Sequence, residues 1–255
     1  MKKKTQKIQD QIQPLNITEI NKQDHSPIIP QRNKIKFDLH IIENFKFTDK
    51  QQEFIQLALD KNTKLMFVSG PAGTTKSFLS IYCALKLLNE RRLSELIYVR
   101  SIVESADSKM GYLPGEIDSK ISPYMEVLYD KLTELLPKNE IDLLKKDQRL
   151  ITIPVSFLRG AHWNTKFILC DESQNFTMKE LTTLITRIGN YSKIIIAGDP
   201  EQSDINGKSG FIKMMNIFDD EQSRQNGIYT FKFTDEDILR SQLVKFIVQK
   251  LRTQG

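Results

Sequence analysis

The sequence predicts a three-layer α/β fold in which helices cover both faces of a mostly parallel β-sheet. From Phe37 onward, short apolar runs alternate with stretches of helical periodicity. Most of these runs are almost continuously hydrophobic, which is typical of strands that are buried on both faces of a parallel sheet. Glycine and proline gather at turns and form no linker. Residues 37–255 are therefore expected to form one domain.

Each predicted strand is a short segment rich in β-branched and aromatic residues, bounded by turn residues or by a helical pattern. In chain order the predicted strands are Lys64–Ser69 (KLMFVS), Glu95–Val99 (ELIYV), Ile151–Val155 (ITIPV), Lys166–Cys170 (KFILC), Lys193–Ala197 (KIIIA) and Ile228–Phe233 (IYTFKF). The segments between and around them repeat apolar residues every three or four positions, which predicts helices. These helices are Lys50–Leu59, Ser77–Asn89, Ile121–Leu136, Lys179–Ile188 and Arg240–Leu251.

The composition excludes several classes of protein. The chain has 255 residues, of which 39% are apolar and 27% charged, as in an ordinary globular protein. Its two cysteines, Cys83 and Cys170, have no metal-type spacing, so neither a disulfide framework nor a zinc site is expected. No apolar run has the length of a membrane span, and the N-terminus lacks the apolar stretch of a signal peptide. We therefore expect a cytoplasmic protein without a membrane partner.

The positive charge is concentrated at the N-terminus. Residues 1–36 contain eight lysines and arginines against three acidic residues, so this segment carries the whole formal net charge of +5. It is also rich in Gln, Asn and Pro, a composition that buries too little surface to offset the entropy of ordering. We predict a flexible basic tail over residues 1–36, which is either a solvated extension or an arm for an anionic partner.

A phosphate-binding loop is predicted directly after the first strand. It comprises Gly70, Pro71, Ala72, Gly73, Thr74, Thr75, Lys76 and Ser77 and leads into a predicted helix. In such a loop the backbone N–H groups and the helix N-terminus face the phosphates of a nucleotide. We expect the Lys76 ammonium to contact the β- and γ-phosphates and the Ser77 hydroxyl to coordinate Mg²⁺.

Thr75 departs from the usual loop pattern, which has glycine immediately before the lysine. Threonine adds a Cβ atom and a hydroxyl beside the phosphates. If this position needs a positive φ, the threonine costs about 1 kcal/mol. Slow turnover is therefore expected.

Two further strands are followed by polar residues suited to nucleotide hydrolysis. Asp171 and Glu172 follow KFILC, and Gln202 stands shortly after KIIIA. Asp171 suits Mg²⁺, and Glu172 suits the attacking water, although the two acids could instead cap the next helix. Gln202 can hydrogen-bond to the γ-phosphate or to that water. Together with the loop, these residues predict a nucleoside triphosphatase.

The sequence resembles the PhoH-like ATPases, which are phosphate-loop proteins related to superfamily one helicases. The shared motifs occur in family order over about residues 45–250. They are TDKQ (48–51), GPAGTTKS (70–77), VRS (99–101), KMGYLPG (109–115), PY (123–124), LYD (128–130), FLRG (157–160), DESQN (171–175), TRIG (186–189), GDPEQSD (198–204), SG (209–210) and DILR (237–240).

The resemblance implies a RecA-like domain that binds ATP at Gly70–Ser77 and Mg²⁺ at Ser77 and Asp171. It also implies that Glu172 is the catalytic acid and that Gln202 senses the γ-phosphate. Gln51 matches the position that reads the adenine edge in related helicases, where an amide supplies one donor and one acceptor. The alternative for Gln51 is an exposed residue on a helix.

Related helicases bind ATP between two domains, the second of which provides an arginine. Because one such domain is predicted here, the resemblance implies that a neighbouring subunit completes the cleft in a homo-oligomeric ring, expected to be a hexamer. The candidate arginines are Arg187 and Arg240, with Arg100 as a lesser candidate. Each could instead be a surface residue or an ion-pair partner.

Three functions are compatible with these residues. The first is an ATP-driven translocase or helicase on RNA or single-stranded DNA, in which Lys109 and Lys120 contact phosphates and Tyr112 stacks on a base. Tyr112 could instead pack in the core beside a structural turn. The second is an ATPase switch that binds a protein or RNA without unwinding. The third, a small-molecule phosphotransferase, ranks last because the acidic pair and Gln202 favour water as the acceptor.

Overall fold

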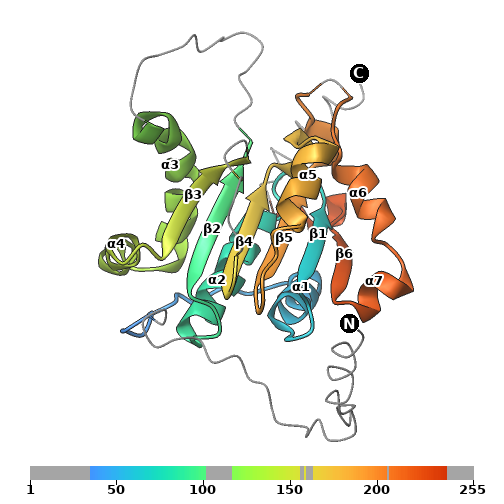
Figure 1. Cartoon of the computed structure of the whole chain (residues 1–255). Coiled ribbons are helices and arrows are strands. Elements are labelled where there is room, and N and C mark those ends of the chain that lie inside the picture. The colour runs from blue at the N-terminus through green and yellow to red at the C-terminus, as the bar shows by residue number, and fades with distance from the viewer. Residues whose placement is uncertain (1–34, 102–116, 156–157, 159–162, 206, 240–255) are drawn as a thin grey trace, which may run out of the picture.

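The computed structural model describes residues 35–101, 117–155, 158, 163–205 and 207–239, with residues 117–125 described by their backbone. Within this part of the chain, six strands form one sheet in the order β3-β2-β4-β5-β1-β6, and every pairing is parallel (Figure 1). The strands are β1 (Leu65–Ser69), β2 (Glu95–Arg100), β3 (Leu150–Pro154), β4 (Lys166–Asp171), β5 (Lys193–Gly198) and β6 (Ile228–Lys232).

Helices cover both faces of the sheet, which confirms the predicted α/β fold (Figure 1). The helices are α1 (Asp49–Leu59), α2 (Lys76–Asn89), α3 (Ile117–Leu135), α4 (Lys138–Lys146), α5 (Met178–Ile185), α6 (Phe211–Ile217) and α7 (Glu221–Gln225). Each predicted strand is present, with both ends within one residue of the prediction. The strands were predictable because their burial on both faces makes them continuous apolar runs.

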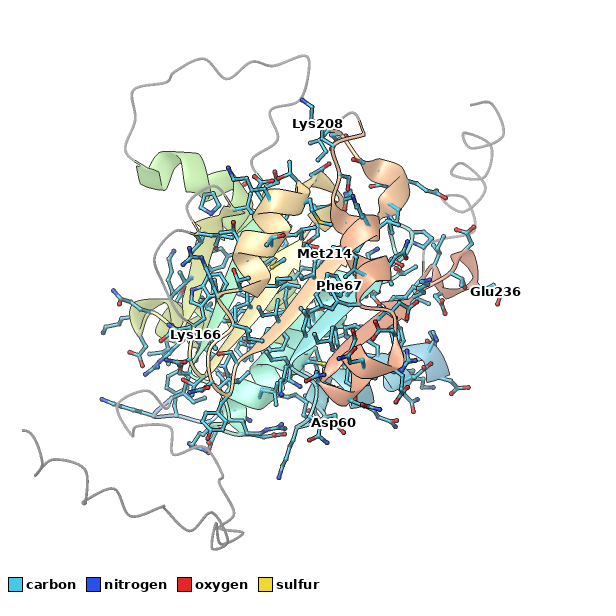
Figure 2. The ribbon with its side chains drawn as sticks, turned by 45° about the vertical axis from the view of Figure 1, so that its right-hand side comes forward. Asp60, Phe67, Lys166, Lys208, Met214 and Glu236 are labelled. Atoms are coloured by element: carbon cyan, nitrogen blue, oxygen red, sulfur yellow. The ribbon has the colours of Figure 1, made fainter. Side chains whose placement is uncertain are left out.

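Two hydrophobic cores lie on opposite faces of the sheet. Met66 and Val68 of β1 pack with α1, α2 and α3, whereas Leu65 and Phe67 pack with α5 and α6. This division follows the alternation of side chains along a strand. Phe67 and Met214 of α6 both belong to the second core and are labelled in Figure 2. Packing in the two cores holds the strands in place, and the polar motifs lie at the carboxyl ends of β1, β4 and β5.

The helices differ from the prediction in three ways, the first being that α3 begins at Ile117 instead of the predicted Ile121. α4, α6 and α7 were not predicted, because nine, seven and five residues are too few for a clear helical period. α5 ends at Ile185, before the predicted Ile188, because Ile188 forms a parallel bridge with Trp163. The predicted helix Arg240–Leu251 and residues 1–34 of the predicted tail lie outside the described residues. Among the residues that the structure describes, no helix combines the length and the hydrophobicity needed to cross a bilayer.

Residues 35–47, called the strap below, run along α2 from its C-terminal end to the carboxyl edge of the sheet. Ile35 and Leu39 are buried, and the Leu39 N–H donates to Asn89 Oδ1 at the end of α2 (2.7 Å). Further on, Glu43 accepts from Lys86 Nζ (2.7 Å), and this hydrogen bond lowers the pKa of the Glu43 carboxyl. The strap ends with aromatic residues packed on α2, as its Phe47 ring lies 5.3 Å from that of Tyr82.

Candidate nucleotide-binding site

A cavity of about 780 Å³ opens at the carboxyl ends of β1, β4 and β5. Predicted site residues line it from four segments: Gln51 in α1, Ala72, Gly73, Thr75, Lys76 and Ser77 in the loop, Asp171 and Glu172 at the end of β4, and Gln202 after β5. In Figure 1 the strand arrows end at this same edge of the sheet. Ligand sites of open α/β sheets lie at such edges. The structure thus brings together residues that are separated in the chain.

The phosphate loop is held tightly against its neighbours. The Gly70 N–H donates to the carbonyl of Gly198 (3.2 Å), and a Cβ atom at Gly70 would lie 2.7 Å from Phe233 Cβ. Lys76 is buried, and its ammonium donates to the carbonyls of Gly70 (2.6 Å) and Pro71 (2.8 Å). The loop backbone therefore folds around the lysine head group.

Thr75 has φ 62° and ψ 19°, in the left-handed region, at the N-cap of α2. A β-branched residue is rare there because its Cβ atom crowds the backbone. Thr75 therefore has the positive φ on which the expected cost of about 1 kcal/mol depended. Its hydroxyl does not cap α2 but donates to the Thr74 carbonyl (2.7 Å) and accepts from Gln51 Nε2 (2.8 Å).

Asp171 lies at the end of β4 and accepts two hydrogen bonds. Ser77 Oγ donates to its Oδ1 (2.7 Å), and the Tyr98 hydroxyl of β2 donates to its Oδ2 (2.7 Å). Burial raises the pKa of Tyr98 well above its ordinary value, and the Asp171 charge raises it further, so the phenol stays a donor. Tyr98 was not predicted as a site residue; the signal was a tyrosine among the aliphatic residues at the centre of the strand.

The donor atoms of Asp171 and Ser77 fit Mg²⁺, which prefers carboxylate and hydroxyl oxygens. Among the described residues there is no cluster of three or more His, Cys, Asp or Glu side chains that could hold a metal ion. A site of one carboxylate and one hydroxyl suits Mg²⁺ in particular, because this ion takes its other ligands from phosphates and water.

Glu172 also has a left-handed backbone, with φ 53° and ψ 41°, at the start of the short helix η3 (Ser173–Asn175). Its side chain makes no capping hydrogen bond with that helix. Instead Oε2 accepts from Gln174 Nε2 (2.6 Å), and Oε1 lies 3.6 Å from Arg100 Nη2. Backbone strain of this kind is often found at functional residues. The carboxylate lines the cavity and is 38% exposed.

Gln174 connects Glu172 to the segment after β5. Its Oε1 accepts from the Asp199 N–H (3.0 Å), and its Nε2 donates to the Gln202 carbonyl (3.3 Å). Asp199 in turn accepts from the Ala72 N–H of the phosphate loop (2.9 Å). Sequence reasoning assigned no role to Gln174 or Asp199, although both stand within the motifs that it singled out.

The cavity wall also contains residues that the sequence did not suggest. Phe45 and Phe47 of the strap line it, and the Phe45 ring lies edge-on to that of Phe78 with centroids 5.0 Å apart. The available signal was a pair of aromatic residues just before the TDKQ motif. Lys131 and Glu134 of α3 line it as well and form an ion pair (2.9 Å).

The predicted arginines are not brought together at this cavity. Arg187 follows α5 and is not among the residues that line the cavity, whereas Arg100 lies beside Glu172. Arg240, Lys109 and Tyr112 lie outside the described residues, as does the side chain of Lys120.

Comparison with known proteins gives a consistent result. A family model described as "PhoH-like protein" matches residues 45–252. The chain is 33% identical to a PhoH-like protein of Mycobacterium tuberculosis (strain H37Rv) over 79% of its own length and 56% of the relative's. It is 30% identical to a PhoH-like protein of Bacillus subtilis (80% and 63%) and 27% identical to the protein PhoH of Escherichia coli K12 (72% and 51%). The chain thus spans about half to three fifths of the length of these relatives.

Proposed function

The chain belongs to the PhoH-like family, and we propose that it is a Mg²⁺-dependent ATPase that couples hydrolysis to the binding or unwinding of RNA or single-stranded DNA. The observation that carries the proposal is the convergence of Lys76, the Ser77–Asp171 pair and Glu172 on one cavity. Phosphate binding, metal binding and water activation are the three requirements of phosphoanhydride hydrolysis.

In this proposal the phosphate loop binds the phosphates through its backbone N–H groups, and Lys76 contacts the β- and γ-phosphates. Asp171 and Ser77 hold Mg²⁺, which neutralises phosphate charge when it is bound. Glu172 accepts a proton from the water that attacks the γ-phosphorus, as the bond to the β–γ bridging oxygen breaks. Gln202 orients that water or contacts the γ-phosphate. The products are ADP and phosphate.

The strap and α1 supply the wall for the base. The rings of Phe45 and Phe47 are available for apolar contact with a purine. Gln51, buried at the same wall, reads the adenine edge with one donor and one acceptor. ATP is therefore the proposed nucleotide.

Nucleic-acid binding and assembly extend the proposal beyond the cavity. We propose a cytoplasmic ring, by analogy a hexamer, in which Arg187 or Arg240 of one subunit reaches the nucleotide of the next. Support comes from the resemblance to helicases and from the position of Arg187 away from its own cavity. A second candidate, the ATPase switch without unwinding, follows if nucleic acid leaves turnover unchanged.

The deciding experiment is ATP hydrolysis by the full chain with Mg²⁺, with and without single-stranded RNA and DNA. Lys76→Ala should lower turnover at least about 100-fold, and Lys213→Ala, at an exposed position on α6, is the matched control that should not. Stimulation by one polymer that falls with salt would identify the nucleic acid. Equal turnover without and with polymers would favour the switch. If the wild-type chain hydrolyses no ATP, the proposal is wrong.

A further inference from the structure

The Gln174 side chain joins the segment that contains the proposed base to the segment that contains the proposed sensor. Gln174 is 1% exposed, and its Oε1 accepts from the Asp199 N–H (3.0 Å). Its Nε2 donates to Glu172 Oε2 (2.6 Å) and to the Gln202 carbonyl (3.3 Å). One buried amide therefore connects η3, which follows β4, with the residues that follow β5.

The position of this amide is set by the end of β5 and not by Glu172. Only the amide oxygen can accept from a backbone N–H, so the contact with Asp199 leaves the nitrogen facing Glu172. The end of β5 also lies directly against the amide, because a Cβ atom at Gly198 would be 2.9 Å from Gln174 Oε1. Ser203 Oγ donates to the Gln174 carbonyl (3.2 Å). The N–H group that faces Glu172 is thus fixed relative to the sheet.

The Glu172 carboxylate depends on this hydrogen bond for its position. It is 38% exposed and makes no capping hydrogen bond with η3. The other described residue that pairs with it is Arg100, at 3.6 Å, which is too long for a hydrogen bond, and a partly exposed ion pair of this kind contributes little. A general base has to lie within hydrogen-bond reach of the water that it activates. The contact with Gln174 is therefore the one that restricts the carboxylate.

We infer that Gln174 is a positioning residue for hydrolysis: its amide holds the Glu172 carboxylate in a fixed relation to the Gln202 segment, so that base and sensor are aligned. This inference rests on the proposed function, since it assumes that Glu172 accepts a proton from the attacking water. Gln174 is not among the described residues that line the cavity, so it acts through Glu172 and not by contact with the nucleotide.

The test is Gln174→Met, which keeps the length and bulk of the side chain and removes its amide. The kcat for ATP hydrolysis should fall about 10-fold to 100-fold, because a misplacement of about 1 Å at a catalytic group costs that much rate. The dissociation constant of the β,γ-imido analogue of ATP with Mg²⁺, measured by calorimetry on the full chain, should change by less than about threefold. A merely structural role would weaken the binding of the analogue together with kcat.

Asn175→Leu is the matched control. Asn175 is buried in the same short helix and also bridges to the segment after β5: its Nδ2 donates to Asp204 Oδ2 (3.0 Å), and its Oδ1 accepts from the Asp204 N–H (2.8 Å). Neither residue is among the described residues that line the cavity. Removing this bridge should lower the temperature of unfolding, whereas kcat should stay within about threefold of the wild-type value.

Two further measurements keep the test decisive. Gln174→Asn keeps the amide but shortens the side chain by a methylene, so it should lower kcat in the same way if the methionine variant does not fold. In a Glu172→Gln background, Gln174→Met should lower the single-turnover rate no further, because Gln174 acts through Glu172.

The inference would be overturned, while ATP hydrolysis stands, by a kcat in the Gln174 variants that matches that of Asn175→Leu. An equal loss of analogue binding, or a further fall of the rate in the Glu172→Gln background, would overturn it as well. A wild-type chain that hydrolyses no ATP would overturn the proposed function and this inference with it.

Discussion

Thr75 and Glu172 both adopt left-handed backbone conformations beside the cavity. Such positions favour glycine, because a Cβ atom crowds the backbone there and costs on the order of 1 kcal/mol. The fold tolerates the two residues because their neighbours hold them: Gln51 donates to Thr75, and Gln174 donates to Glu172. At the residue scale, the candidate site therefore includes two residues with strained backbone conformations, Thr75 and Glu172.

Replacing Thr75 by glycine should raise the rate of ATP hydrolysis. The change removes the Cβ atom beside the phosphates, and relief of about 1 kcal/mol of crowding in the transition state corresponds to about a fivefold higher kcat. Steady-state hydrolysis at saturating ATP measures it. Thr75→Ala, which keeps the Cβ atom and loses the hydroxyl, should not show the increase. A Thr75→Gly rate at or below that of the wild type would contradict this explanation.

At the scale of elements, the site depends on how closely the strand ends approach one another. A Cβ atom at Gly198 would lie 2.9 Å from the backbone nitrogen of Gln174, so β5 and η3 touch without space for a side chain. The hydrogen bond from the Ala72 N–H to Asp199 joins the loop after β1 to the segment after β5. The phosphate loop and the Glu172 carboxylate are thereby positioned by one connected set of elements.

The opposite edge of the sheet contains a buried cation. Lys193 at the start of β5 donates to the carbonyls of Ala58 (2.6 Å) and Asp60 (2.7 Å) at the end of α1. Asp60 marks this lower edge in Figure 2. Burial, reinforced by the charge of Arg92, lowers the pKa of Lys193 to about 8. A positive charge is stabilised at the C-terminus of a helix, whereas desolvation favours the neutral form of the lysine.

The stability of the wild-type chain relative to Lys193→Met should rise with pH between about 8 and 10. An unfolded lysine keeps its proton to about pH 10.4, whereas folded Lys193 loses it near pH 8, so the unfolded chain binds more protons in this window. The free energy of unfolding should increase by on the order of 2 kcal/mol relative to the variant. Urea unfolding of both proteins at pH 7.5, 9 and 10 tests this. Parallel pH dependences would show that Lys193 titrates normally.

At the scale of the whole molecule, the cavity is lined by residues of the strap and of the carboxyl edge of the sheet, and Arg187 is not among the described residues that line it. The formal net charge of +5 is carried by residues 1–36, so residues 37–255 are formally neutral. A general attraction of the domain for nucleic acid is therefore not expected, and any contact has to come from local surfaces. Assembly into a ring would create such surfaces between subunits.

Two inactive variants should restore each other's activity if subunits share sites. Lys76→Ala lacks the phosphate-binding lysine, and Arg187→Ala lacks the proposed arginine but should still bind ATP. In a mixed ring, Lys76 of one subunit can meet Arg187 of the next, so part of the ATPase activity should return. The two variants are unfolded, mixed and refolded together. Each variant unfolded and refolded alone is the control. If the mixture of the two variants recovers no activity beyond that of the separate variants, the sites are not shared.

The sequence by itself determined the six strands, the phosphate loop and the acidic pair. Each of these is a local pattern: a buried parallel strand is a continuous apolar run, and a phosphate loop follows directly from strand to helix. The short helices were missed because they contain too few turns to show a period. The features of the site that depend on neighbouring residues in the chain were thus predictable, including the backbone strain expected at Thr75 if its φ is positive.

Only the tertiary structure decided which of these residues touch. Gln51 and Thr75, Tyr98 and Asp171, and Ala72 and Asp199 are 24, 73 and 127 positions apart in the chain. No local pattern specifies such pairs. They depend on the strand order β3-β2-β4-β5-β1-β6 and on how the elements around the carboxyl edge of the sheet pack against one another. Hydrogen-bond partners at the site are a property of the tertiary structure, because strand pairing and the packing of α1 against α2 bring these donor and acceptor atoms within 3 Å of one another.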